Sequence, residues 1–164
     1  MSRTAAPKAH GPAARSAEGS PVSSERFVDG YLGYLLGQAN HALYKDFDAQ
    51  VRAAGLSSIE WRVLASLHDS PPLTISQLAH EVLSKQPTIT KLVQRMCEQG
   101  WLALQADAAD QRRTLVTTTA AGKRLVRPLM EKARSHETAM LQALPAGERA
   151  ALKKLLSKLA RRAQ

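Results

Sequence analysis

The stretch 84–101, SKQPTITKLVQRMCEQGW, constrains the fold of this chain more than any other segment. Its apolar residues recur at spacings of three and four, which is typical of an amphipathic helix with one buried stripe. These residues are Ile89, Leu92, Val93 and Met96. Ser84 is expected to cap the start of the helix, Pro87 suits its first turn, and Gly100 is expected to end it. By itself, the pattern is equally typical of an ordinary surface helix.

A shorter apolar pattern directly before this segment predicts another helix over 75–82, followed by a tight turn at Leu83. In a helix-turn-helix motif the two helices cross closely. The crossing needs a small residue in the first helix and an apolar residue ten positions later. Ala79 and Ile89 stand at these positions, so we interpret the two helices as a helix-turn-helix.

Two short segments rich in apolar and β-branched residues flank the loop 106–114 and are predicted to be strands. The loop, ADAADQRRT, is polar and carries two adjacent arginines near its end. A hairpin with a basic tip after a helix-turn-helix predicts a winged helix, and Leu73 is expected to add a bridge residue to its small sheet. The expected fold class is therefore mainly α with a small β-wing.

The segments on both sides of the winged helix show helical patterns that need a partner to bury their apolar residues. One long helix is predicted to end at Gly55, and two more follow from Ala121, the first of them bent at Pro128. The chain is too short to cover these helices by itself, which favours a homodimer. We therefore divide the chain into a disordered tail (1–24), an N-terminal dimerisation helix (25–55), the winged helix-turn-helix (56–120) and C-terminal dimerisation helices (121–164).

Composition narrows the class of partner and compartment. The net charge is +9, and residues 1–24 hold only three basic residues against one acidic residue, so the folded part carries most of the excess. Such an excess favours a polyanionic partner such as DNA. The single cysteine, Cys97, excludes an internal disulfide and indicates a reducing compartment. No apolar run reaches the roughly 18 residues that span a bilayer, so a cytoplasmic protein without membrane contact is expected.

No motif indicates an enzyme. The sequence has neither a Gly-rich phosphate loop nor a nucleophile elbow, and its histidines lack the spacing of a helical zinc site. Catalysis, a cofactor and a metal are therefore not expected. Two alternatives to a sequence-specific DNA-binding protein stay open. The basic charge also suits a non-specific architectural nucleic-acid-binding protein, and the leucines of the last helix suit a protein-interaction module.

From about Glu25 to its end, the sequence resembles the MarR family of bacterial transcriptional regulators in the order of its elements. The most specific match is DQRRTLVTTTAAG, at 110–122, which is similar to the family's Asp-x-Arg signature followed by a strand and a Leu-Thr-x-x-Gly turn. Thr118 stands where leucine is usual. The resemblance implies a ligand-responsive regulator whose homodimer binds an inverted-repeat operator in double-stranded DNA. A repressor is expected, although the same docking would serve an activator and the sequence does not distinguish the two.

The resemblance also implies which residues contact DNA. They are Ser84, Lys85, Gln86, Thr88, Thr90, Lys91 and Arg95 on the recognition helix, and Asp110, Arg112 and Arg113 in the wing. Arg112 is expected to enter the minor groove while the Asp110 carboxylate braces the loop. On the helix, Lys91 and Arg95 are expected at phosphates or guanines, and the polar side chains at adenines or thymine methyl groups.

Members of this family respond to small anionic aromatic ligands, and the resemblance implies such an effector here. The candidate contacts are Tyr34, Gln38, His41, Trp61 and Arg62. Arg62 or His41 would pair with a carboxylate while the rings stack on the ligand. In the alternative interpretation, the tyrosines and Trp61 belong to the dimer core and Arg62 to an ion pair. Cys97 follows the apolar stripe and is expected to be a buried, unreactive thiol.

Overall fold

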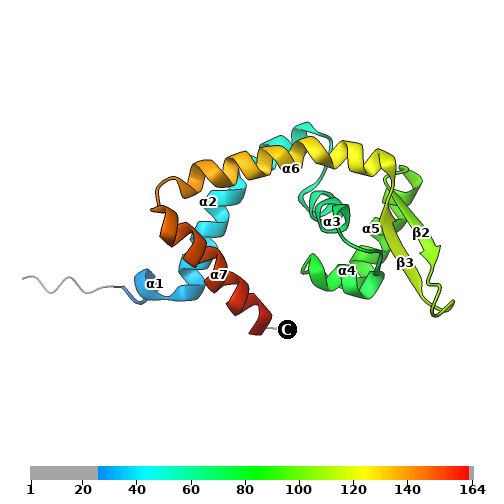
Figure 1. Cartoon of the computed structure of the whole chain (residues 1–164), viewed down its shortest axis with the longest axis horizontal. Helices are drawn as coiled ribbons and strands as arrows, with labels where there is room; N and C mark the ends of the chain where they lie inside the picture. Colours follow the sequence, from blue (N-terminus) through cyan, green and yellow to red (C-terminus); the bar gives the residue numbers. More distant parts are fainter. Residues whose placement is uncertain (1–25, 163–164) are drawn as a thin grey trace, which may run out of the picture.

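The computed structural model describes residues 26–162 and is shown in Figure 1. Its elements are, in order, α1 (Phe27–Gly30), α2 (Leu32–Ala53), α3 (Ser58–His68), β1 (Leu73–Thr74), α4 (Ile75–Glu81), α5 (Gln86–Glu98), β2 (Leu102–Ala106), β3 (Thr114–Thr118), α6 (Ala120–Leu141) and α7 (Ala146–Arg162). The long helix α6 joins two groups of elements. In Figure 1, α3, α4, α5 and the strands lie on the right, and α1, α2 and α7 lie on the left. The predicted tail at 1–24 lies outside the described residues.

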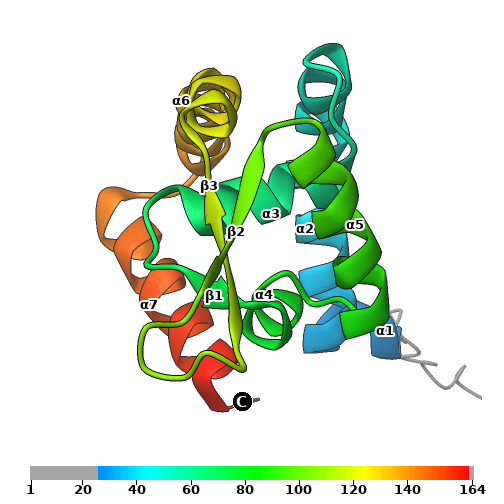
Figure 2. The same cartoon turned by 90° about the vertical axis from the view of Figure 1, so that its right-hand side faces the viewer.

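The group that contains the strands is a winged helix (Figure 2). Ala79 and Ile89 are 4% and 0% exposed where α4 and α5 pack together, as the predicted helix crossing requires. The three strands form an antiparallel sheet in the order β1-β3-β2. Val116 of the central strand pairs with Leu73 on one side and Leu104 on the other. The predicted fold class, mainly α with a small β-wing, is confirmed.

Local signals in the sequence set most of the helix ends. Gly55 and Gly100 have φ values of 77° and 73°, a conformation that glycine adopts without the steric cost of a β-carbon. Ser57 caps α3 and Thr74 caps α4, each in a capping box in which the third helical residue bonds back to the cap amide. These two boxes fix where the chain enters the helices that support α5.

The predicted N-cap of α5, Ser84, is wrong, because the cap lies one residue later. Leu83 adopts a φ of 52°, and the Ser84 amide donates to a carbonyl of α4 at 2.9 Å, so Ser84 still belongs to the turn that closes α4. α5 begins at Gln86, and its N-cap, Lys85, makes no side-chain capping bond. Pro87 lies in the first turn, as predicted. The turn at Leu83 therefore uses the Ser84 amide, and Ser84 does not cap α5.

The predicted single N-terminal helix is also interrupted. α1 ends at Gly30, Tyr31 is extended with a ψ of 114°, and α2 begins at Leu32. The Tyr31 ring stacks on Phe27 with ring centroids 5.1 Å apart. The same ring folds back over Gly33, where an added β-carbon would lie 3.0 Å from Tyr31 Cε1. Weak helix propensity at the glycines thus lets the aromatic pair interrupt the helix at Tyr31.

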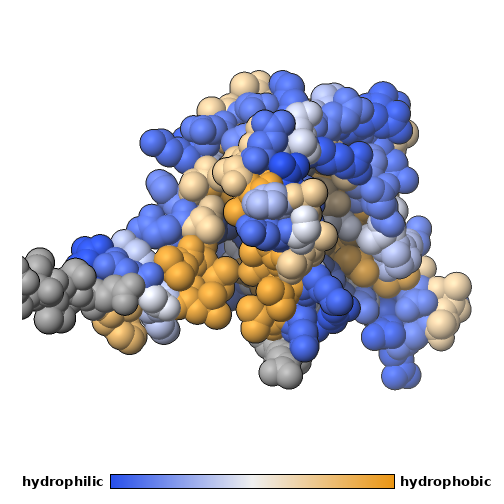
Figure 3. Space-filling view, turned by 60° about the vertical axis from the view of Figure 1, so that its left-hand side comes forward, coloured by the Kyte–Doolittle hydropathy of each residue, from blue (hydrophilic) through white to orange (hydrophobic). Residues whose placement is uncertain are grey.

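α1, α2 and α7 leave many apolar side chains uncovered. Side chains between 37% and 79% exposed include Phe27, Tyr31, Leu32, Leu35, Leu152, Leu155, Leu156 and Leu159. Figure 3 shows orange, apolar surface gathered in this part of the molecule. Uncovered apolar surface of this kind is typical of binding sites for proteins or ligands. It includes the leucine seam predicted for the last helix.

Thr119 ties the segment after α5 to the start of α6. Its hydroxyl donates to the Gly100 carbonyl at 2.7 Å and accepts the Gly122 amide at 3.1 Å. Gly122 lies directly against the Trp101 carbonyl, so an added β-carbon would overlap that oxygen and approach the Thr118 methyl group to 2.8 Å. The Thr-x-x-Gly turn is therefore a close backbone contact that fixes how α6 leaves the wing.

We expect Gly122→Ala to lower the free energy of unfolding by about 1–3 kcal/mol, because backbone must shift to accept the methyl group. Urea denaturation followed by circular dichroism at one fixed protein concentration measures this change. Gly147→Ala is the matched control, since Gly147 lies in α7 with nothing within 4 Å of an added β-carbon. Equal unfolding midpoints for the two variants would contradict the close contact.

Candidate nucleic-acid interface and ligand cavity

The face of α5 that points away from the core carries most of the predicted contacts. Exposed on it are Lys85, Gln86, Thr88, Lys91 and Arg95. Two members of the predicted set differ, because Ser84 and Thr90 are half-buried. The Thr90 hydroxyl donates to the Gln86 carbonyl at 3.0 Å and is thus engaged with its own helix. The exposed side chains form a mixed polar and basic surface able to meet base edges and phosphates.

The wing loop holds its arginines by bonds to the backbone. Asp110 Oδ1 accepts the Arg112 amide at 3.0 Å, and the Asp110 carbonyl accepts the Arg113 amide at 2.9 Å. The Arg113 carbonyl in turn accepts the Asp107 amide at 3.0 Å, which closes the loop. Both arginines are exposed, and neither guanidinium forms an ion pair with any residue in the part of the chain that is described. The loop therefore presents two unmatched positive charges on a braced backbone.

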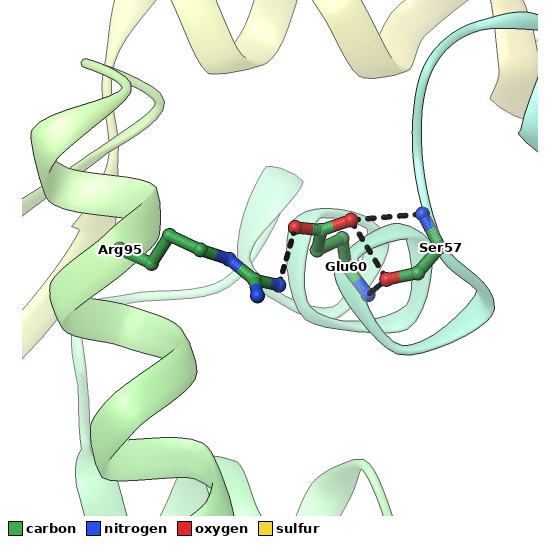
Figure 4. Close-up of polar contacts among 3 residues, drawn as sticks. All are labelled: Ser57, Glu60 and Arg95. Carbon is green, nitrogen blue, oxygen red and sulfur yellow. Dashed lines mark hydrogen bonds and ion pairs between the residues drawn. The ribbon is translucent and has the colours of Figure 1, made fainter.

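A buried carboxylate that the sequence did not single out links α3 to α5 (Figure 4). Glu60 is only 6% exposed, and its Oε2 accepts both the amide and the hydroxyl of Ser57, at 2.8 and 2.7 Å. Its Oε1 accepts Arg95 Nη2 at 2.8 Å. Burial alone raises the pKa of Glu60, but the bonds from Ser57 and Arg95 and the Arg95 charge outweigh it, so the pKa lies below its ordinary value. The Ser-x-x-Glu spacing indicates the cap, although nothing local indicates the partner on α5.

A cavity of about 820 Å³ lies where α2 meets the first turns of α3 and the end of α4. Of the five predicted effector residues, His41, Trp61 and Arg62 line it. Tyr34 and Gln38 lie outside it, on earlier turns of α2. Tyr44 and Lys45 line the cavity but were not predicted.

One wall of the cavity is aromatic and part of its rim is cationic. The rings of Phe47 and Trp61 meet edge to face with centroids 5.3 Å apart. His41, Lys45 and Arg62 can carry positive charge, and no ion pair or hydrogen bond engages the Arg62 side chain among residues 26–162. An aromatic ring beside an unmatched guanidinium suits an aromatic carboxylate.

Two acidic residues, Asp48 and Glu81, also line the cavity, and the Asp48 carboxylate is held by partners of its own. Asp48 Oδ1 accepts the Ser58 hydroxyl at 2.6 Å, and Asp48 Oδ2 pairs with Arg52 at 2.7 Å. The Ser58 bond is the main cause that lowers the pKa of Asp48, and the Arg52 charge adds to it against the effect of burial. This carboxylate bridges α2 to the first turn of α3 and stays ionised.

Cys97 is half-buried on α5, close to the predicted state. Burial raises the pKa of its thiol, and the neighbouring Glu98 charge raises it further, so the reactive thiolate is disfavoured. Within the described residues, no cluster of histidine, cysteine and acidic side chains could hold a metal ion. No helix of this part of the chain is long and apolar enough to cross a membrane.

We expect Glu60→Gln to destabilise the fold by about 1–3 kcal/mol at pH 7, because a buried, charge-assisted bond is lost. The folded pKa of Glu60 lies below its ordinary value of 4.5, so its stabilisation is present above that pH and disappears as the pH falls through the lower folded value. The difference between the two proteins should therefore shrink on acidification. Urea melts from pH 7 to pH 3 measure it, and a constant difference would show that Glu60 does not ionise as inferred.

Comparisons with known proteins agree with this geometry. The MarR family model matches residues 54–113. The HTH-type transcriptional repressor NicR of Pseudomonas putida is 30% identical over 128 residues, which cover 78% of this chain and 81% of NicR. The crystal structure of the MarR family transcriptional regulator SPO1453 from Silicibacter pomeroyi shares 37% identity with a TM-score of 0.71, covering 82% of this chain and 99% of that one.

A further solved structure is that of NadR in complex with 4-hydroxyphenylacetate. It shares 26% identity with a TM-score of 0.74, and the match covers 79% of this chain and 92% of NadR. The braced wing, the helix-turn-helix and these similarities lead to one conclusion. The chain belongs to the MarR family of transcriptional regulators.

Proposed function

We propose that this protein is a sequence-specific DNA-binding repressor that binds an inverted-repeat operator as a homodimer and is released by a small aromatic carboxylate. The observation that carries the proposal is the wing, in which Asp110 holds Arg112 and Arg113 without neutralising them. Figure 2 shows α5 and the β2-β3 hairpin on the same face of the molecule. Exposed Gln86 and Thr88 on α5 are proposed to read the major groove with Lys91 at a phosphate beside it, while the wing reaches the minor groove.

The homodimer is proposed from the uncovered apolar side chains of α1, α2 and α7. An apolar surface of this extent is stabilised by a second copy of the same surface across a two-fold axis. A two-fold protein places its recognition helices in successive major grooves, roughly 34 Å apart. The operator is therefore proposed to be an inverted repeat with half-sites one helical turn apart. A non-specific architectural protein would need no such spacing.

The effector is proposed to bind in the cavity between α2 and α3. Arg62, which has no ion-pair partner within residues 26–162, is proposed to bind the carboxylate, with His41 and Lys45 nearby. Trp61 and Phe47 supply the aromatic wall. NadR, which is similar over most of this chain, binds 4-hydroxyphenylacetate. This supports an aromatic acid as the class of ligand.

The DNA proposal is tested with duplexes that the wild-type protein selects from a randomised library. We expect an enriched inverted repeat that is bound about a thousandfold or more tightly than random duplex. Arg112→Ala should weaken binding and reduce the slope of log affinity against log salt by about one, because one unmatched charge is lost. Arg26→Ala, at the N-cap position before α1 and at the opposite end of the molecule in Figure 1, is the control and should leave the slope unchanged. Equal affinity for all duplexes would favour the architectural alternative.

The effector proposal is tested by isothermal titration with 4-hydroxyphenylacetate and with its uncharged amide. We expect the acid to bind and the amide to bind at least about tenfold more weakly, since the carboxylate loses a charge-assisted bond. Arg62→Ala and His41→Ala should weaken binding of the acid. Gln38→Ala is the matched control, because Gln38 lies on α2 outside the cavity. Identical heats from all four proteins would remove Arg62 and His41 from the site.

A further inference from the structure

Arg95 differs from the other cations of the DNA-facing surface because its charge is already matched. Its Nη2 lies 2.8 Å from Glu60 Oε1, although the two residues are 35 positions apart. Lys91 and Arg112 have no such partner among the described residues. A cation already paired with a carboxylate contributes little to the release of counterions from DNA. The pair therefore weakens the case for Arg95 as a phosphate contact.

The pair is asymmetric in a way that keeps Arg95 in place. The side chain of Arg95 is 57% exposed, whereas that of Glu60 is 8% exposed. Water can solvate the guanidinium if the two separate, but it cannot reach the buried carboxylate as easily. Glu60 Oε2 is already occupied by Ser57, so Oε1 would be left without a partner in a poorly solvated site. Moving Arg95 to a phosphate would therefore cost the fold a buried charge.

The Glu60–Arg95 pair can set the orientation of α5, which the apolar core contacts cannot do. The buried stripe of α5, which is Ile89, Leu92, Val93 and Met96, fixes the depth of the helix, but apolar contacts are not directional. A short bond to Glu60 is directional and lies at one side of the helix. Thr88 and Lys91 lie seven and four residues before Arg95, so the three share one line along the helix surface. Fixing Arg95 therefore sets where Thr88 and Lys91 point.

We propose that Arg95 is a positioning residue that fixes the rotation of α5 about its axis by bonding to Glu60, and that it does not contact DNA. The inference rests on the proposed sequence-specific DNA binding. It replaces the sequence-based expectation that placed Arg95 at a phosphate or guanine. Glu60 thereby becomes a residue of the DNA-reading apparatus although it is buried in the first turn of α3.

The test compares Arg95→Met, Glu60→Gln, the double variant and Lys91→Met on the duplex selected by the wild-type protein and on random duplex. We expect Arg95→Met to bind the selected duplex about tenfold more weakly, with an unchanged salt slope and unchanged binding to random duplex. Lys91→Met, the phosphate-contact control, should reduce the slope by about one and weaken both duplexes. Glu60→Gln should lose selectivity as Arg95→Met does, and the double variant should be no worse than either single one.

A direct contact between Arg95 and phosphate predicts the opposite pattern. Arg95→Met would then reduce the salt slope, and Glu60→Gln would keep or raise affinity because it frees the guanidinium. Either result overturns the inference. If Glu60→Gln fails to fold, the slope and selectivity of Arg95→Met still decide, because Arg95 is exposed and its loss leaves the apolar stripe intact. If the library yields no enriched duplex, the proposed function fails and the inference falls with it. An enriched duplex with a reduced slope for Arg95→Met overturns the inference alone.

Discussion

A buried carboxylate has to be matched by donors, and in this protein the donors of Glu60 come from two helices. Ser57 supplies an amide and a hydroxyl from the start of α3, and Arg95 supplies a guanidinium from α5. The Glu60 side chain thus takes part in the cap at the N-terminus of α3 and also orients α5. Apolar packing around Leu64 and Ile89 gives the winged helix its stability, but such packing alone permits small rotations. The Glu60 bonds supply the direction that the core lacks.

The same turn of α3 also borders the ligand cavity. Ser58, Trp61 and Arg62 line it, and they are neighbours of Ser57 and Glu60 in the chain. The bond between Asp48 and Ser58 attaches α2 to this turn from the other side. A ligand that changed the contact between α2 and α3 would therefore act on the residues that hold Arg95. This places the proposed effector and the proposed DNA-reading helix on opposite sides of one helical turn.

Patterns within about ten residues predicted most of the fold, because caps, glycine ends and the Ala79-to-Ile89 crossing are local or nearly so. The errors at Ser84 and Tyr31 arose where a competing local contact replaced the predicted pattern. The Ser84 amide serves the turn that closes α4, and Tyr31 packs on Phe27 and Gly33 in place of continuing a helix. In the site, the contact that could not be predicted is a long-range one. The wing could be predicted from the short segment Asp110 to Arg113, whereas the Glu60–Arg95 pair joins residues that no local pattern connects. The predicted domain boundaries and DNA contacts of this protein stay predictions.

α6 connects the neighbourhood of the ligand cavity to the wing. It has 22 residues and is therefore about 33 Å long, and it runs from the wing to the apolar helices. Phe47 of α2 packs against Trp61 of α3 on one side and stacks on His136 of α6 on the other, with centroids 5.3 and 6.2 Å apart. His136 Nε2 also lies 2.9 Å from the Leu43 carbonyl of α2. Phe47 also lines the cavity, so a ligand bound in the proposed site would contact the ring that packs on both α3 and α6. The other end of α6 leads to the wing, and one continuous helix therefore links the residues around the proposed ligand site to the proposed DNA contacts.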